Sequence, residues 1–143
     1  MEKYLFIIQI LTTFMMTGII WFVQVVHYPL LAQAVRENFP QIGNTHATLT
    51  GYVVAPLMIL ELATSLYLAA FTTNSLFQVP FGIGAGLVLL IWGSTFFVQV
   101  PILKRLLAGF SDAEHQKLVN TNWVRTILWT LRSIILFYIL FLL

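Results

Sequence analysis

Long apolar stretches alternate with short polar segments along almost the whole chain, and these stretches define the predicted helices. Each is longer than the roughly 20 residues that a helix needs to cross the hydrocarbon core of a bilayer. The predicted spans cover about residues 4–34, 40–72, 76–107 and 112–142. Because short connections make successive helices antiparallel neighbours, we expect an antiparallel four-helix transmembrane bundle made of two helical hairpins. The predicted fold is all-α, a polytopic membrane protein in which residues 1–143 form one four-span domain.

Composition narrows the class of protein further. Only 8% of the residues are charged and the mean hydropathy is +0.91, whereas soluble domains carry about 25% charged residues. A lipid bilayer is therefore the expected partner. The net charge of +2 is too small to indicate nucleic-acid binding, and a chain without cysteine excludes disulfides and thiolate chemistry. The first apolar stretch is longer than a signal-peptide core, so we interpret it as the first span.

Basic residues predict the orientation of the bundle, because cytoplasmic connections carry an excess of Lys and Arg. Arg36, Lys104, Arg105 and Lys117 fall at the two connections on one side, whereas the opposite side offers only Lys3. We therefore expect a multi-pass protein of the cell membrane with both termini outside and the charged loops in the cytoplasm.

The second half of the sequence echoes the first. Pro29 and Pro101 align at an offset of 72 residues. A competing register matches identical runs of four residues at 22–25 and 97–100. We prefer the proline register because it requires only a one-residue difference in loop length between the halves. Each half holds two spans, so the halves would form a parallel internal repeat about an axis along the membrane normal.

Glu61 and Arg132 are charged residues deep inside the second and fourth spans. An offset of 71 aligns these two spans and places Glu61 at the position of Arg132. A charge at the bilayer centre costs roughly 2.5–3.5 kcal/mol on insertion scales, so such groups face a partner or water. We therefore expect a Glu61–Arg132 pair. The pair could fix which helices are neighbours, or it could take part in proton or substrate handling.

A second polar layer is predicted nearer the charged loops. Folding each hairpin about its loop brings polar side chains from different spans to similar depths. Together they would line a polar pocket that opens toward the cytoplasm. The members of this layer are His27, His46, Thr48, Gln99, Asn120 and Asn122, and Gln24 is a further candidate pocket residue.

His27 and His46 are the candidate metal ligands of this layer. Imidazole is the commonest metal ligand and titrates near neutral pH, and two histidines on different helices could bind a transition metal or a haem iron. No further ligand motif accompanies them, so the sequence assigns no cofactor. In the alternative interpretation, His46 only begins the second span, and His27 hydrogen-bonds a carbonyl that Pro29 leaves free.

Asn122 and Arg125 form the most specific polar pair of the fourth span. They are three residues apart and so lie on one helix face. An arginine beside an amide could clamp a carboxylate, a phenolate or a quinone oxygen. It could also extend to a lipid phosphate at the membrane surface.

Three other positions have ordinary interpretations. Gly82 and Gly86 are four residues apart, a spacing that lets membrane helices pack closely, and we attribute it to packing within the bundle. His115 follows the start of the fourth span, where we expect it to face water.

These motifs together resemble those of the anthrone-oxygenase-like family of small four-span membrane proteins. The resemblance rests on Pro29, on Val100-Pro101 and on the motif Asn122-x-x-Arg125-Thr126. It covers most of the chain and departs at Leu103, where the family often has asparagine. The resemblance implies a four-helix bundle, oxidation of a polycyclic phenolic substrate, and Asn122 and Arg125 as the polar site residues.

Three functions are compatible with these residues. The first is an oxidoreductase or oxygenase-like protein that acts on a lipophilic small molecule, with His27 as proton acceptor and Asn122 and Arg125 positioning an oxyanion. The second is an oligomeric transporter or channel component, in which Glu61 and Arg132 form a charged gate. The third is a non-catalytic membrane subunit whose polar residues specify packing. A homo-oligomer is compatible with all three, and the second requires one because four helices are few for a substrate path.

Overall fold

A computed structural model describes residues 2–33 and 39–142, and every regular element in that part of the chain is helical. The predicted all-α fold is therefore confirmed. Arg36, which contributed to the predicted orientation, lies outside the described residues. The elements are α1 (Glu2–Phe22), η1 (Val23–His27), α2 (Tyr28–Leu31), α3 (Phe39–Phe71), α4 (Ser75–Ser94), η3 (Thr95–Gln99), α5 (Val100–Ala108) and α6 (Asp112–Leu142).

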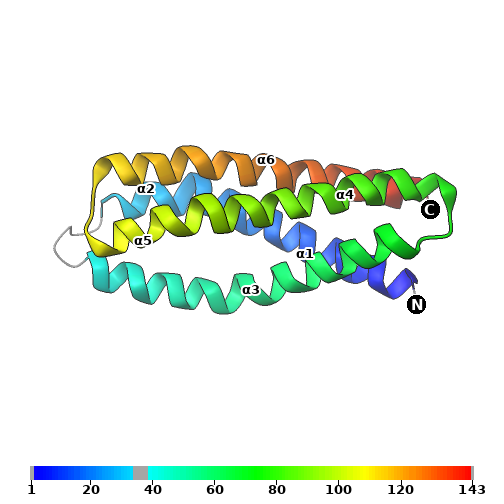
Figure 1. Cartoon of the computed structure of the whole chain (residues 1–143), viewed down its shortest axis with the longest axis horizontal. Coiled ribbons are helices and arrows are strands. Elements are labelled where there is room, and N and C mark those ends of the chain that lie inside the picture. Colours follow the sequence, from blue (N-terminus) through cyan, green and yellow to red (C-terminus); the bar gives the residue numbers. More distant parts are fainter. Residues whose placement is uncertain (1, 34–38, 143) are drawn as a thin grey trace.

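These elements form four long rods that lie side by side and alternate in direction (Figure 1). The first rod is α1, η1 and α2, the second α3, the third α4, η3 and α5, and the fourth α6. α1 packs against α3 and α6, and α4 packs against the same two helices, so the rods form a closed ring. Both termini lie at one end of the bundle, here called the termini end, and the opposite end is called the loop end.

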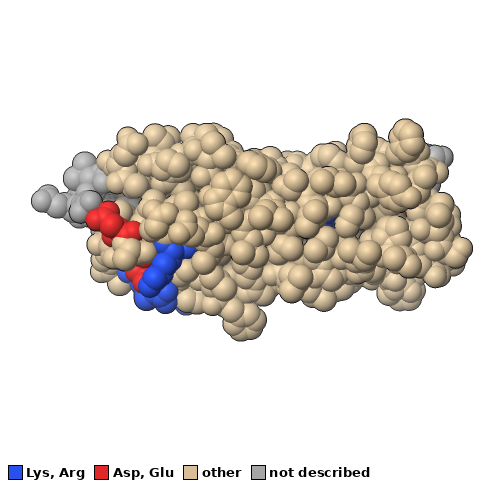
Figure 2. Space-filling view, turned by 90° about the horizontal axis from the view of Figure 1, so that it is seen from above, with Lys and Arg blue, Asp and Glu red and all other residues tan. Residues whose placement is uncertain are grey.

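The surface of the bundle suits a membrane. All four rods are long and apolar enough to cross a bilayer. Large apolar side chains point outward along them, and Phe97 and Phe141 are 84% and 82% exposed. Figure 2 shows most of the charged side chains in view gathered at the loop end, with other residues over the rest of that face. Because lipid accepts apolar surface that water does not, this distribution supports a multi-pass membrane protein.

Two π-helical turns interrupt the first and third rods at equivalent places. The Tyr28 N–H donates to the Val23 carbonyl, and the Val100 N–H donates to the Thr95 carbonyl. A proline follows directly in each case, at Pro29 and at position 101. Proline has no N–H and its ring clashes with the carbonyl four residues earlier, a conflict that a wider turn relieves. The two π turns differ by the same 72 positions as the prolines, which favours the proline register of the repeat.

The interior alternates apolar and polar layers along its length. Apolar clusters lie at the termini end, at the middle and at the loop end, and they centre on Phe81, Trp129 and Leu106. The buried Glu61 and Arg132 lie between the first and second clusters, and the buried Asn122 lies between the second and third. The bundle therefore holds two polar layers, each enclosed by apolar packing.

The interpretation of Gly82 and Gly86 as packing residues of the bundle is wrong. Both are exposed, and a Cβ atom added at either would meet nothing within 4 Å. The side of α4 that faces the interior instead carries Phe81, Ala85 and Val88. The glycines lie one position after Phe81 and Ala85, and one residue rotates the helix by about 100°.

Candidate functional site

The polar layer nearer the termini end is built around an ion pair. Glu61 on α3 and Arg132 on α6 approach to 3.1 Å between Oε1 and Nε, and their side chains are 0% and 1% exposed. The predicted Glu61–Arg132 contact is therefore confirmed. The two residues come from the second and fourth rods, which the repeat places at matching positions.

Each of the two charges is surrounded by hydrogen-bonding groups of the complementary kind. Glu61 accepts hydrogen bonds from the Thr13 hydroxyl at 2.8 Å and from the Trp129 indole N–H at 2.9 Å. Arg132 donates to the Gly84 carbonyl and, at 2.8 Å, to the Ser65 hydroxyl. Donors therefore surround the carboxylate, and acceptors surround the guanidinium. This arrangement satisfies both charges with protein groups, as a buried pair requires.

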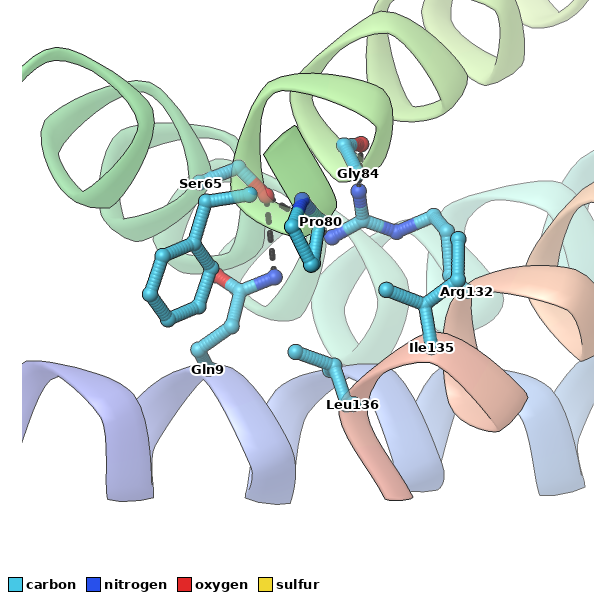
Figure 3. Close-up of a pocket in the computed structure, with 8 residues that line it drawn as sticks. Gln9, Ser65, Pro80, Gly84, Arg132, Ile135 and Leu136 are labelled. Atoms are coloured by element: carbon cyan, nitrogen blue, oxygen red, sulfur yellow. Dashed lines mark hydrogen bonds between the residues drawn. The ribbon is translucent and has the colours of Figure 1, made fainter. Parts of the chain in front are cut away.

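A small cavity lies beside this network. Gln9 on α1 donates to Ser65 at 2.9 Å and accepts from the Thr64 hydroxyl, which extends the network toward the termini end. In Figure 3, Gln9, Ser65 and Arg132 point toward one another around Pro80 of α4. The cavity there measures about 10 Å³, which is about the room that one water molecule needs. A cavity of this size has no room for a substrate.

The polar layer nearer the loop end centres on Asn122 and Arg125 of α6. The Asn122 amide donates to the Gln24 side chain at 2.6 Å, and its oxygen accepts from Arg125 Nε at 3.0 Å. Arg125 also donates to Gln99 at 3.5 Å and to Thr95 at 3.4 Å. The structure therefore brings together four predicted site residues, Gln24, Gln99, Asn122 and Arg125, from three rods.

The two arginines of α6, Arg132 buried and Arg125 half-buried, differ in their charge environment. Arg132 has the carboxylate of Glu61 beside it. Arg125 has only neutral groups: two amide oxygens, the Thr95 hydroxyl and the Tyr28 phenol. Within residues 2–33 and 39–142, no acidic side chain forms an ion pair with Arg125. The loop-end layer therefore carries a positive charge with no counter-charge among the described residues.

His27 and His46 lie face to face at the loop end. Their ring centroids are 4.0 Å apart and the planes differ by 24°, so the predicted similarity in depth is confirmed. Both ring nitrogens of His46 lie 3.2–3.3 Å from the Thr50 hydroxyl. Buried His27 Nε2 has no hydrogen-bond partner in the described part of the chain.

This stack does not fit a shared metal or haem iron. Imidazole lone pairs lie in the plane of the ring, and zinc sits about 2.0–2.1 Å from a ligating nitrogen. Two nearly parallel rings at 4.0 Å therefore cannot both direct a nitrogen at one ion. Residues 2–33 and 39–142 also hold no group of three His, Cys, Asp or Glu side chains that could complete a site.

Two further predictions about polar residues are wrong. Asn120 is exposed and accepts from Gln116 on the outer side of α6, so it does not line the interior pocket. Two residues further along, Asn122 is rotated by about 200° and points inward. His115 does not face water: it is 8% exposed, and its Nε2 lies 3.0 Å from the Tyr28 carbonyl. The fourth rod therefore binds the first near the Pro29 interruption.

Several buried or half-buried residues that form these two layers were not predicted from the sequence. A usable signal was present, because Gln9 and Thr13 on one side of α1 are four residues apart, and Thr64 and Ser65 follow Glu61 by three and four. Polar side chains at that spacing share a helix face. The missed residues are Gln9, Thr13, Tyr28, Thr64, Ser65, Thr95, Thr121 and Trp129.

Comparison of the chain with family models, with curated proteins and with solved structures finds no match. A functional assignment must therefore rest on the geometry of the two polar layers. The resemblance to the anthrone-oxygenase-like family stays a prediction.

Proposed function

We propose that this membrane protein binds a lipophilic small molecule through an anionic oxygen, such as a phenolate or carboxylate, at Arg125. The observation that supports the proposal is the missing counter-charge. Arg125 is hydrogen-bonded only to neutral groups among the described residues, whereas Arg132, seven residues further along the same helix, has Glu61.

The physical argument is a comparison of these two arginines. A charged side chain inside the membrane pairs with an opposite charge, contacts water or marks a binding site. Among the residues that the structure describes, Arg132 meets the first condition and Arg125 does not. An anion bound at Arg125 would supply the missing charge through bonds about twice as strong as neutral ones. The rest of the ligand would be apolar, because the protein lies in a bilayer. The positive charge of Arg125 and the surrounding lipid together indicate a lipophilic anion.

The neighbours of Arg125 would orient such a ligand. Asn122 holds the guanidinium through its side-chain oxygen and is itself held by Gln24, so the donor is fixed from two rods. The Tyr28 phenol also contacts Arg125 and offers a further hydroxyl to the anion. The His27 ring lies 6.2 Å from the Tyr28 ring, between centroids. His27 therefore stands beside the proposed site as a proton acceptor for a phenol, without touching Arg125.

The proposal is limited to binding. An oxidation of the bound phenol, which the family resemblance implies, would require an oxidant in addition to these side chains. The ion-pair layer fits the packing role of a non-catalytic subunit, because protein groups satisfy both of its charges. The Arg125 layer is the one that a packing role leaves unexplained.

The proposal also includes the membrane orientation that the basic residues predict, with both termini outside and the loop end in the cytoplasm. Lys104, Arg105 and Lys117 lie at the loop end of α5 and α6, which supports this orientation. The Arg125 layer would then be reached from the cytoplasmic half of the membrane. Labelling of single cysteines introduced at positions 73 and 109 with an impermeant reagent tests this, and labelling of position 109 alone in intact cells would contradict it.

Binding of a hydroxyanthraquinone tests the site, because its phenolate and phenol forms absorb at different wavelengths. We expect saturable binding of the phenolate by purified protein in detergent. Arg125→Gln should weaken binding at least about tenfold, or about 1.4 kcal/mol, because the charge is lost. The affinity of Arg125→Lys should lie between those of the wild type and Arg125→Gln, because lysine keeps the positive charge but lacks the planar guanidinium with its paired N–H donors.

The matched control is Arg105→Gln, which removes an arginine whose side chain is 54% exposed at the loop end. This variant should bind as the wild type does. Equal affinity in Arg125→Gln and the wild type would refute the proposal, and so would equal losses in Arg125→Gln and Arg105→Gln. Because removal of an unpaired charge should not unfold the bundle, each variant is first checked for a single monodisperse species.

A further inference from the structure

A second cavity opens at the termini end of the bundle, far from the Arg125 layer along the rods. It measures about 380 Å³, within the range of small-molecule sites. All four rods contribute to its lining, so it is an opening between helices and not a groove on one of them. The lining residues are Glu2, Lys3, Phe6, Leu68, Thr72, Asn74, Phe77, Phe81 and Ile139.

The inner part of this cavity is apolar and aromatic. The Phe6 and Phe81 rings meet edge to face at 5.8 Å between centroids, and Phe77 and Phe81 do so at 6.3 Å. Leu68 and Ile139 complete the wall. Such a lining excludes water and accepts hydrocarbon, with about 25 cal/mol gained for each Å² of apolar surface buried.

Phe81 forms the floor of the cavity. The same side chain lines the water-sized cavity beside Gln9 and Arg132. The Phe81 ring therefore separates the larger cavity from the ion-pair network, which lies deeper in the bundle. A ligand chain that enters from the termini end would stop at Phe81 and leave the buried charges undisturbed.

The rim of the cavity is polar and carries both signs of charge. Glu2 and Lys3 are neighbours at the start of α1, and both are exposed. Thr72 and Asn74 also line the cavity and lie in the connection between α3 and α4, at the same end of the bundle. A carboxylate beside an ammonium complements a zwitterion better than it complements an anion or a cation. This rim also lies at the end of the bundle, where lipid headgroups lie in a membrane.

We propose that the termini-end cavity binds a zwitterionic single-chain lipid of the lysophosphatidylcholine class. Its acyl chain lies among Phe6, Phe77 and Phe81, and its headgroup sits at the rim with the phosphate toward Lys3 and the quaternary ammonium toward Glu2. The site is independent of the proposed site at Arg125, because the two share no residue and lie in opposite halves of the bundle.

Photolabelling tests this site with lysophosphatidylcholine that carries a diazirine on its acyl chain. The protein is placed in nanodiscs of diacyl phosphatidylcholine, and adducts are mapped by mass spectrometry. We expect saturable labelling of Phe6, Phe77 or Phe81. Unlabelled lysophosphatidylcholine should compete at least about tenfold better than the fatty acid or the monoacylglycerol of the same chain length.

Thr72→Trp should block the cavity, because an indole at the rim fills the entrance, and labelling should fall at least about tenfold. Thr73→Trp is the matched control: it introduces the same side chain one position along, at an exposed residue that does not line the cavity. Lys3→Gln should keep the labelling but remove the preference for the phosphocholine headgroup.

Three results would overturn the proposal. The first is labelling that rises without saturation and spreads over lipid-facing residues. The second is equal labelling of Thr72→Trp and Thr73→Trp. The third is equal competition by all three amphiphiles in the wild type, which would reduce the cavity to a non-selective apolar opening. None of these results bears on the hydroxyanthraquinone assay, so failure of either proposal leaves the other standing.

Discussion

Replacing Glu61 with glutamine should destabilise the bundle more than any neutral change in the same network. In the wild type, Glu61 Oε1 accepts from Thr13 at 2.8 Å and from Arg132 at 3.1 Å, and Oε2 accepts from Trp129 at 2.9 Å. Glutamine keeps one oxygen and replaces the other with an amide donor. One of the three donors then faces another donor, and Arg132 loses its counter-charge.

The lost charge dominates the magnitude of this effect. Breaking a buried ion pair by removing one partner costs about 3–5 kcal/mol, because the remaining charge stays buried and unpaired. A neutral hydrogen bond between membrane helices is worth much less, on average about 0.6 kcal/mol. We therefore expect a loss of about 3 kcal/mol or more for Glu61→Gln. Thr13→Val, which removes hydrogen bonds but keeps the ion pair, should cost about 1 kcal/mol.

Reversible unfolding in mixed micelles measures these differences. The protein in a mild detergent is titrated with sodium dodecyl sulfate. The transition is followed by the fluorescence of its four tryptophans, which include Trp129, the residue that donates to Glu61. Exchange of the two charges, Glu61→Arg with Arg132→Glu, should fail to restore stability. Position 61 faces the Trp129 and Thr13 donors, and position 132 faces acceptors, so each exchanged charge would meet groups of the wrong kind.

Two outcomes would refute this reasoning. If the free energy of unfolding of Glu61→Gln lies within about 0.5 kcal/mol of the wild-type value, the pair is not buried as the contacts indicate. If the exchanged pair is as stable as the wild type, the sorting of donors and acceptors around the two charges has no energetic importance.

Two other predictions concern positions where the structure corrected the sequence. His115→Ala should cost about 1 kcal/mol in the same unfolding assay, because the ring nitrogen lies 3.0 Å from the Tyr28 carbonyl in the interior; the exposed control Gln116→Ala should be neutral, and equal effects would contradict the burial of His115. Gly82→Ala and Gly86→Ala should each stay within about 0.5 kcal/mol of the wild type, because an added Cβ meets nothing within 4 Å. A loss above about 1 kcal/mol accompanied by a change in oligomeric state would instead place the glycines between copies of the chain.

The sequence determined the spans because their signal is local. A run of apolar residues long enough to cross a bilayer predicts a helix there. Both ends of α3 and α6, the start of α4 and the end of α5 fall within one residue of the predicted boundaries. It also determined the ion pair. Glu61 and Arg132 are opposite charges at corresponding depths, and a charge in lipid must find a partner or water.

Rotation of each helix about its axis was decided only by tertiary packing. In a soluble helix, the alternation of apolar and polar residues shows which face is buried. Here lipid and core are both apolar, so the pattern does not distinguish the two faces. The outward glycines, the exposed Asn120 and the buried His115 all follow from rotations that packing alone sets.

Assembly of the sites also required the folded bundle. The sequence placed Asn122 and Arg125 on one helix face, but their bonds to Gln24 and Gln99 come from other rods. The absence of an acid beside Arg125, within the described residues, depends on where every other chain segment lies. The termini-end cavity needs all four rods at once. Local sequence determines which residues enter the membrane, whereas long-range packing decides which of them meet, because contacts between distant segments leave no periodic trace in the chain.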